Sequence, residues 1–132
     1  MPYAAAAPVV ERLGRTNGRE HYLVTVVETG VTGSTNEWSF TLASAGLPRV
    51  AMVKAVEVTF SGGSATNVDP EAGTYASGAN VYSNGSASAS PCHFNPTSGI
   101  IWPSSATLYG QSNADGTATT VTTKLLIAEG TD

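Results

Sequence analysis

The sequence contains a single cysteine, Cys92, so no disulfide can form within the chain and no zinc site can be built from cysteine ligands. Charged residues make up only 12% of the 132 residues, about half of the quarter that is usual in soluble domains. Hydrophobic residues nevertheless reach 41% and the net charge is only −4, whereas disorder requires low hydrophobicity together with high net charge. We therefore expect one folded domain around a packed core.

Basic residues are few as well. The chain has six Lys and Arg against ten Asp and Glu, whereas nucleic-acid-binding proteins neutralise phosphates with clustered basic side chains. The basic cluster in the sequence consists of Arg12, Arg15 and Arg19, and Glu11 and Glu20 offset it. We expect no direct binding to nucleic acid.

Long apolar runs are missing too. No stretch of 18 apolar residues occurs, so we expect no membrane-spanning segment. The apolar stretch near the N-terminus has no basic residue before it and is interrupted by Pro8, whereas a secretory signal has a basic region and a longer apolar core. We expect synthesis and folding in a cytoplasm.

Amphipathic helical patterns are absent beyond residue 20, and strand patterns take their place. Residues 22–29 form a β-branched run, and Trp38 and Phe40 alternate with polar residues. Residues 50–60 also alternate, with a slip near residues 52–54 that predicts a β-bulge. About six to eight strands between Gly, Pro and Asn turns predict an all-β fold, a single antiparallel β-sandwich for which a jelly roll is one arrangement.

Two stretches of the sequence favour irregular structure. Residues 69–73 read Asp-Pro-Glu-Ala-Gly, which predicts a turn. Residues 76–99 are rich in Ser, Gly, Asn and Ala, which predicts a long loop or short strands with exposed tips. Residues 100–102 follow as a short apolar patch that we expect to be buried.

The first twenty residues differ from the rest, so we divide the chain into an extended N-terminal arm (1–20) and a β-sandwich domain (21–132). An arm with little core potential frays unless it is tied to its own domain or to a neighbouring subunit. The low charge and small loop residues suit packing against other copies, which favours the neighbour. The expected apolar anchors are Tyr3, Val9, Val10 and Leu13, and the expected carboxylate clamps are Arg12, Arg15 and Arg19.

The two residue pairs that suggest catalysis have simpler explanations. Cys92 and His93 are adjacent, so in a strand their side chains point to opposite faces, and nothing places His93 as a base for the thiol, even with Asn95 or Asp115 as an orienting group. Asp69 and Glu71 fit turn chemistry. A calcium ion held by these two, Asp115 and loop carbonyls is the weaker alternative.

Sequence motifs for nucleotide or acyl chemistry are missing. The chain has no GxSxG, no GxxxxGK[ST] and no GxGxxG that opens a helix. We therefore expect a non-enzymatic protein without a cofactor.

The aromatic residues divide into core and contact candidates. Trp38 alternates with Phe40 and is predicted to lie in the core. Tyr75 and Tyr82 border the Ser- and Gly-rich stretch, and we expect them to contact partners outside the domain. Together with Trp102 and Tyr109 they form the basis of an alternative, a carbohydrate-binding module.

Three stretches, Glu37–Phe40, 56–78 and 108–130, together resemble a family of small β-rich structural proteins from tailed-bacteriophage particles. The resemblance implies a homo-oligomer, often a trimer, on the capsid surface of the virion. It implies a capsid cement or decoration protein that bridges neighbouring subunits of the major capsid protein. A tail adaptor or baseplate protein of the same virion is the alternative within this class.

Overall fold

The structure, a computed structural model, describes residues 4–33, 37–48, 51–74, 81–83, 88, 91–96 and 107–130. These residues form β-strands and turns, and among them no helix is long and apolar enough to span a membrane. The strands are β1 (Ala4–Ala5), β2 (Val9–Thr16), β3 (Arg19–Val31), β4 (Glu37–Thr41), β5 (Ala51–Ser61), β6 (Val68–Gly73), β7 (Tyr82–Ser83), β8 (Cys92–Phe94), β9 (Thr107–Ala114) and β10 (Ala118–Glu129).

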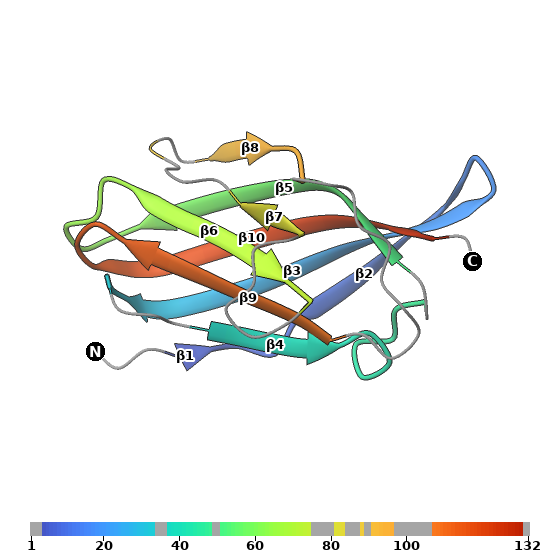
Figure 1. Cartoon of the computed structure of the whole chain (residues 1–132), viewed down its shortest axis with the longest axis horizontal. Coiled ribbons are helices and arrows are strands. Elements are labelled where there is room, and N and C mark those ends of the chain that lie inside the picture. Colours follow the sequence, from blue (N-terminus) through green and yellow to red (C-terminus); the bar gives the residue numbers. More distant parts are fainter. Residues whose placement is uncertain are drawn as a thin grey trace.

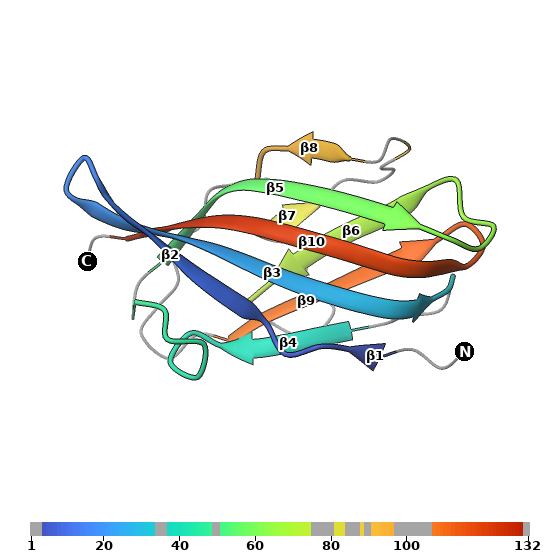
Figure 2. The ribbon, with the colours of Figure 1, turned by 180° about the vertical axis from the view of Figure 1, so that it is seen from behind.

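The strands form two antiparallel sheets that pack face to face (Figures 1 and 2). The six-stranded back sheet has the order β1-β3-β10-β5-β8, with β2 also paired to β3, and the four-stranded front sheet has the order β4-β9-β6-β7. The chain crosses repeatedly between the sheets, so that β3-β10-β5-β8 faces β4-β9-β6-β7, which is the strand arrangement of a jelly roll. The predicted antiparallel β-sandwich is confirmed.

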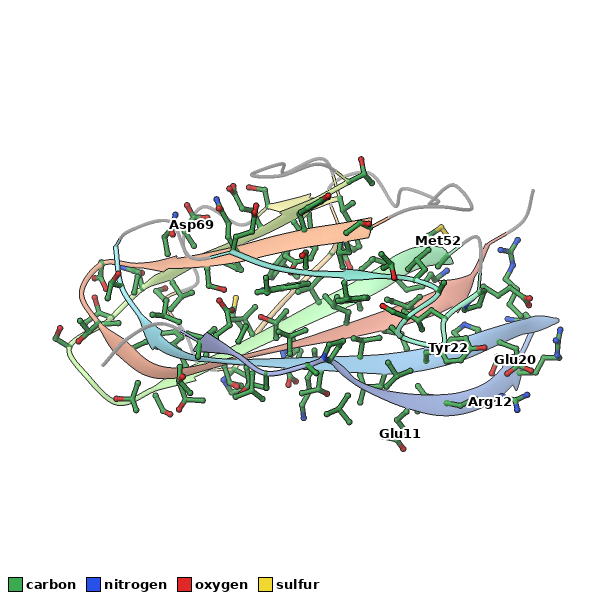
Figure 3. The ribbon with its side chains drawn as sticks, turned by 90° about the horizontal axis from the view of Figure 1, so that it is seen from below. Glu11, Arg12, Glu20, Tyr22, Met52 and Asp69 are labelled. Atoms are coloured by element: carbon green, nitrogen blue, oxygen red, sulfur yellow. The ribbon has the colours of Figure 1, made fainter. Side chains whose placement is uncertain are left out.

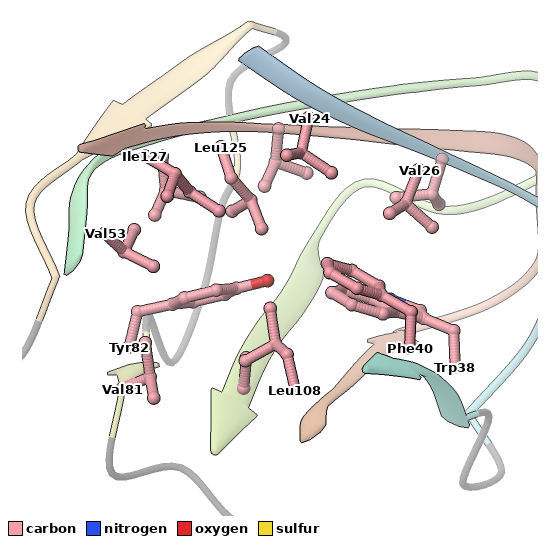
Figure 4. Close-up of a cluster of buried hydrophobic side chains, with 14 of the residues drawn as sticks. Val24, Val26, Trp38, Phe40, Val53, Val81, Tyr82, Leu108, Leu125 and Ile127 are labelled. Atoms are coloured by element: carbon pink, nitrogen blue, oxygen red, sulfur yellow. The ribbon is translucent and has the colours of Figure 1, made fainter. Parts of the chain in front are cut away.

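The core lies between the sheets and consists of the side chains at every second position of the strands, which point inward (Figures 3 and 4). From the back sheet it receives Val24 and Leu125, and from the front sheet it receives Leu108. Trp38 and Phe40 stack with ring centroids 5.9 Å apart, and both are buried. The prediction that Trp38 is a core residue is therefore confirmed.

The predicted irregularity in residues 52–54 is a β-bulge. Leu126 of β10 pairs with Ala55, but the next residue, Ile127, pairs with Val53, so Lys54 is the extra residue of β5. The bulge turns Lys54 outward and lets both Val53 and Val56 face the core.

The turn predicted at residues 69–73 is wrong, because these residues form β6 between β9 and β7. Pro70 is tolerated there for a geometric reason. The Ala72 carbonyl accepts a hydrogen bond from the Val81 N–H at 2.9 Å, so the main-chain polar groups of Ala72 face β7. Pro70 lies two residues before Ala72, so its main chain also faces away from β9, at a point beyond the described end of β7. Its missing N–H therefore breaks no hydrogen bond between β6 and β9.

Residues 76–99 contain short strands, as one of the two predictions for this stretch stated. The two-residue strand β7 pairs with β6, and the three-residue strand β8 pairs with β5. The apolar patch predicted at residues 100–102 lies outside the described residues.

The N-terminal segment lies on its own domain, so the expectation that it reaches mainly toward a neighbour is corrected. Strands β1 and β2 both pair with β3 along its free edge, because the Asn17-Gly18 turn folds β2 back onto it. Both turn residues have positive φ (53° and 77°), which Asn and Gly tolerate and which suits a tight hairpin. The tip of this hairpin extends beyond the front sheet at the end of the molecule where the C-terminus lies (Figures 1 and 2).

Candidate interaction surface

An apolar groove lies on the outer face of the back sheet. Its floor is a cross-strand row in which Leu126 of β10 pairs with Leu23 of β3 on one side and with Ala55 of β5 on the other. All three side chains are only partly buried, and they line a hollow of about 440 Å³. We call this row and its hollow the back-sheet groove.

Charged side chains form one wall of the back-sheet groove. Lys124 of β10 is in register with Glu57 of β5, which is in register with His93 of β8. The His93 Nε2 atom lies 2.6 Å from Glu57 Oε2, although 66% of the His93 side chain remains exposed. An apolar floor beside a charged rim is the usual anatomy of a protein–protein contact surface.

The edge strand β2 also carries exposed hydrophobic residues. Val9, which pairs with Thr25 of β3, is 66% exposed, and Leu13 is 49% exposed. They are the exposed large hydrophobic side chains of the described residues. Val10 differs, because it pairs with Val24, shares its inward face and packs against the core, so its assignment as a partner anchor is wrong.

The three arginines that we expected to clamp a partner bind groups of their own chain instead. Arg12 donates two hydrogen bonds to Glu20, from Nε to Oε2 at 2.8 Å and from Nη2 to Oε1 at 2.7 Å. Arg15 lies 3.4 Å from the same carboxylate, and Arg19 donates to the Glu129 carbonyl at 2.9 Å. The expected bidentate geometry is therefore present, but the carboxylate is intramolecular.

The local sequence contained a signal for this cluster. A two-residue turn at Asn17-Gly18 places Arg15 opposite Glu20 in the hairpin. Hydrogen bonding from Arg12 lowers the pKa of Glu20, and the charge of Arg12 adds to this effect. The cluster thus holds Glu20 ionised and pins β2 to β3.

Tyr82 is a core residue, so its assignment as an outward contact is wrong. Only 1% of it is exposed, and it lies among the buried hydrophobic side chains (Figure 4). Its ring makes an edge-to-face contact with Phe94 at a centroid distance of 5.7 Å. Burial raises the pKa of Tyr82 well above its usual range, and the carboxylates of Glu28 and Glu71 add to the rise.

The other aromatic candidates have different outcomes. Tyr3, Tyr75 and Trp102 lie outside the described residues. Tyr109 of β9 is half-buried, and its position in the strand's alternation places it on the outer face of the front sheet.

Cys92 and His93 occupy consecutive positions of β8, so their side chains alternate between faces as expected. His93 contacts Glu57 at the groove, and Cys92 is half-buried. Within the described ranges, no three His, Cys, Asp or Glu side chains gather as metal ligands. The chemistry that the groove offers is apolar contact with charge pairing at the rim.

No family model and no curated protein matches the chain. Among solved structures, the chain is similar to the C-terminal family 22 carbohydrate-binding module of Xyn10B from Clostridium thermocellum, with 14% identity and a TM-score of 0.31. The likeness covers 96% of this chain and 84% of that one. At this TM-score the likeness supports no functional argument.

Proposed function

We propose that this chain is a non-enzymatic structural protein of a tailed-bacteriophage virion, of the capsid cement or decoration type. It forms a homo-oligomer, with a trimer favoured, and bridges neighbouring subunits of the major capsid protein. The back-sheet groove is the observation on which the proposal rests, because exposed contiguous apolar surface marks an interaction site. The resemblance of the sequence to phage structural proteins supplies the class of partner.

The low charge of the chain supports the same function. With 12% charged residues, the domain presents small polar side chains that lose little rotamer entropy when another subunit covers them. Each contact yields only about 25 cal/mol per Å² of apolar surface removed from water. Many symmetric copies on one particle add these modest contacts through multivalency.

The proposal is tested by measuring how a change in the groove affects binding to capsids of the virus. The variant Leu126→Asp places a charge in the groove floor and should reduce occupancy on capsids at least tenfold. The matched control is Thr122→Asp. Thr122 lies on the same strand and the same outer face as Leu126, but outside the groove. Equal occupancy of both variants and the unmodified chain contradicts the proposal, provided that circular dichroism shows both variants folded.

Copy number in purified virions separates the members of this class. A decoration protein is present in hundreds of copies, whereas a tail adaptor or baseplate protein is present in roughly a dozen, as symmetric particles require. Absence from virions would refute both. The solution mass of the free chain reports whether the trimer forms before capsid binding.

A further inference from the structure

Four oxygen-bearing side chains form a block on the outer face of the front sheet. Asp69 of β6 pairs with Asn113 of β9, and the adjacent outward row pairs Glu71 with Gln111. The residues between them, such as Pro70 and Ser112, are buried and follow the opposite, inward phase. Asp69 lies on the side of the front sheet away from the back sheet (Figure 3).

Three oxygens of this block are buried and have no hydrogen-bond partner. They are Asp69 Oδ1, Gln111 Oε1 and Asn113 Oδ1. Gln111 is only 8% exposed, and its Nε2 donates to Glu71 Oε1, so its other end remains an unpartnered acceptor. Buried polar atoms are normally paired, and here all three unpaired atoms are acceptors, which calls for a positive ligand or a donor.

The surrounding charge favours a positive ion. Strands β4, β6, β7 and β9 contain three carboxylates, Glu37, Asp69 and Glu71, and no Lys, Arg or His.

We propose that Asp69, Glu71, Gln111 and Asn113 form a site for a divalent cation of the Ca²⁺ type. Carboxylate and amide oxygens are the ligands that Ca²⁺ prefers, at 2.3–2.6 Å. Side chains opposite each other on paired strands have Cβ atoms about 5 Å apart, so both can reach one ion.

Asp115 is not part of this site, although the sequence suggested it as a companion of Asp69 and Glu71. It lies in the turn between β9 and β10, where it accepts hydrogen bonds from the N–H groups of Thr66 (2.8 Å) and Asn67 (3.0 Å) and from the Thr66 hydroxyl (2.5 Å). Its oxygens are already satisfied, which makes Asp115 a matched control carboxylate.

Terbium luminescence tests the site directly. Tyr109 lies two residues before Gln111 on the same outward phase, about 7 Å along the strand, so it can transfer excitation to bound Tb³⁺. We expect saturable Tb³⁺ luminescence that Ca²⁺ displaces with a Kd of about 10⁻⁴–10⁻³ M, the range of modest protein sites. Asp69→Asn should weaken Ca²⁺ binding at least tenfold, and Asp115→Asn should leave it unchanged.

A second variant distinguishes an ion site from an internal hydrogen bond. Asn113→Asp adds a charged ligand and should tighten Ca²⁺ binding by about tenfold, with a larger Ca²⁺-dependent rise in melting temperature than in the unmodified chain. If the Asn113 amide instead donates to Asp69, this variant melts earlier and Ca²⁺ does not restore it. That result, or the absence of Tb³⁺ and Ca²⁺ binding at millimolar concentration, overturns the proposal.

Discussion

Glu28 of β3 accepts a hydrogen bond from the Ser112 hydroxyl of β9 at 2.9 Å, and this contact joins the two sheets through the middle of the core. Both residues are buried, with exposed fractions of 0% and 1%. Glu28 follows Val24 and Val26 in the inward phase of β3, so a carboxyl group occupies a position where the pattern places an aliphatic side chain. The contact is a polar link in a core that is otherwise held by apolar packing.

Removing the buried hydroxyl of Ser112 and removing that of Thr123 should change the free energy of unfolding in opposite directions. Ser112→Ala leaves Glu28 without this donor and should lower the free energy of unfolding by about 1–3 kcal/mol. Thr123 Oγ1 is buried without a partner, so Thr123→Val should raise the free energy of unfolding by about 1 kcal/mol. Urea denaturation of both variants measures these changes, and an unchanged or higher free energy of unfolding for Ser112→Ala would show that the link does not stabilise the sandwich.

Gly110 allows Trp38 to lie flat against the front sheet. A Cβ atom added at Gly110 would overlap the six-membered ring of Trp38, which is stacked on Phe40 and has little room to move. Gly110→Ala should therefore lower the free energy of unfolding by about 1–3 kcal/mol. In a Trp38→Leu background the same change should cost much less, and a thermal-melting double-mutant cycle with no coupling would contradict the overlap.

Asp115 makes the stability of the chain depend on acid pH. Hydrogen bonds from the Thr66 hydroxyl and then from the N–H groups of Asn67 and Thr66 lower the pKa of Asp115 to about 2. The unfolded pKa is about 3.9, so this contribution is complete above about pH 4 and is lost as the pH falls toward 2. Asp115→Asn should flatten the fall in urea midpoint between pH 4 and pH 2, and Thr66→Val should do so in part. Parallel curves for the variant and the unmodified chain would disprove this assignment.

Removal of residues 1–16 should destabilise the domain as well as weaken partner binding. The deletion uncovers the edge of β3 and removes Val10 from the core, and an unpaired strand edge promotes aggregation. We expect a lower melting temperature and a concentration-dependent increase in solution mass. A truncated chain that melts at the original temperature would show that β2 adds no stability. Val9→Asp is then the better probe of partner binding, since Val9 is largely exposed.

Local pattern predicted strands in both sheets. The pattern in β3, β4 and β5 identified these strands, the core position of Trp38 and the bulge near Lys54. In a strand, side chains alternate between the two faces every second residue, and a bulge shows as one extra residue in this alternation. Both can be read directly from the sequence. The Asn17-Gly18 turn is equally local, although its consequence for Arg15 and Glu20 was missed.

What the sequence by itself determined was therefore that residues 22–29, residues 50–60 and the stretch around Trp38 are strands, because the alternation of apolar side chains depends only on neighbours in the chain. The tertiary structure alone decided that residues 69–73 form a strand, since their turn composition is overridden by pairing with β9. It also decided that Tyr82 is buried, that the arm pairs with β3, and that Asp69 meets Asn113. Each of these depends on which strands become partners, and that choice is made by the burial of the whole core rather than by any local stretch.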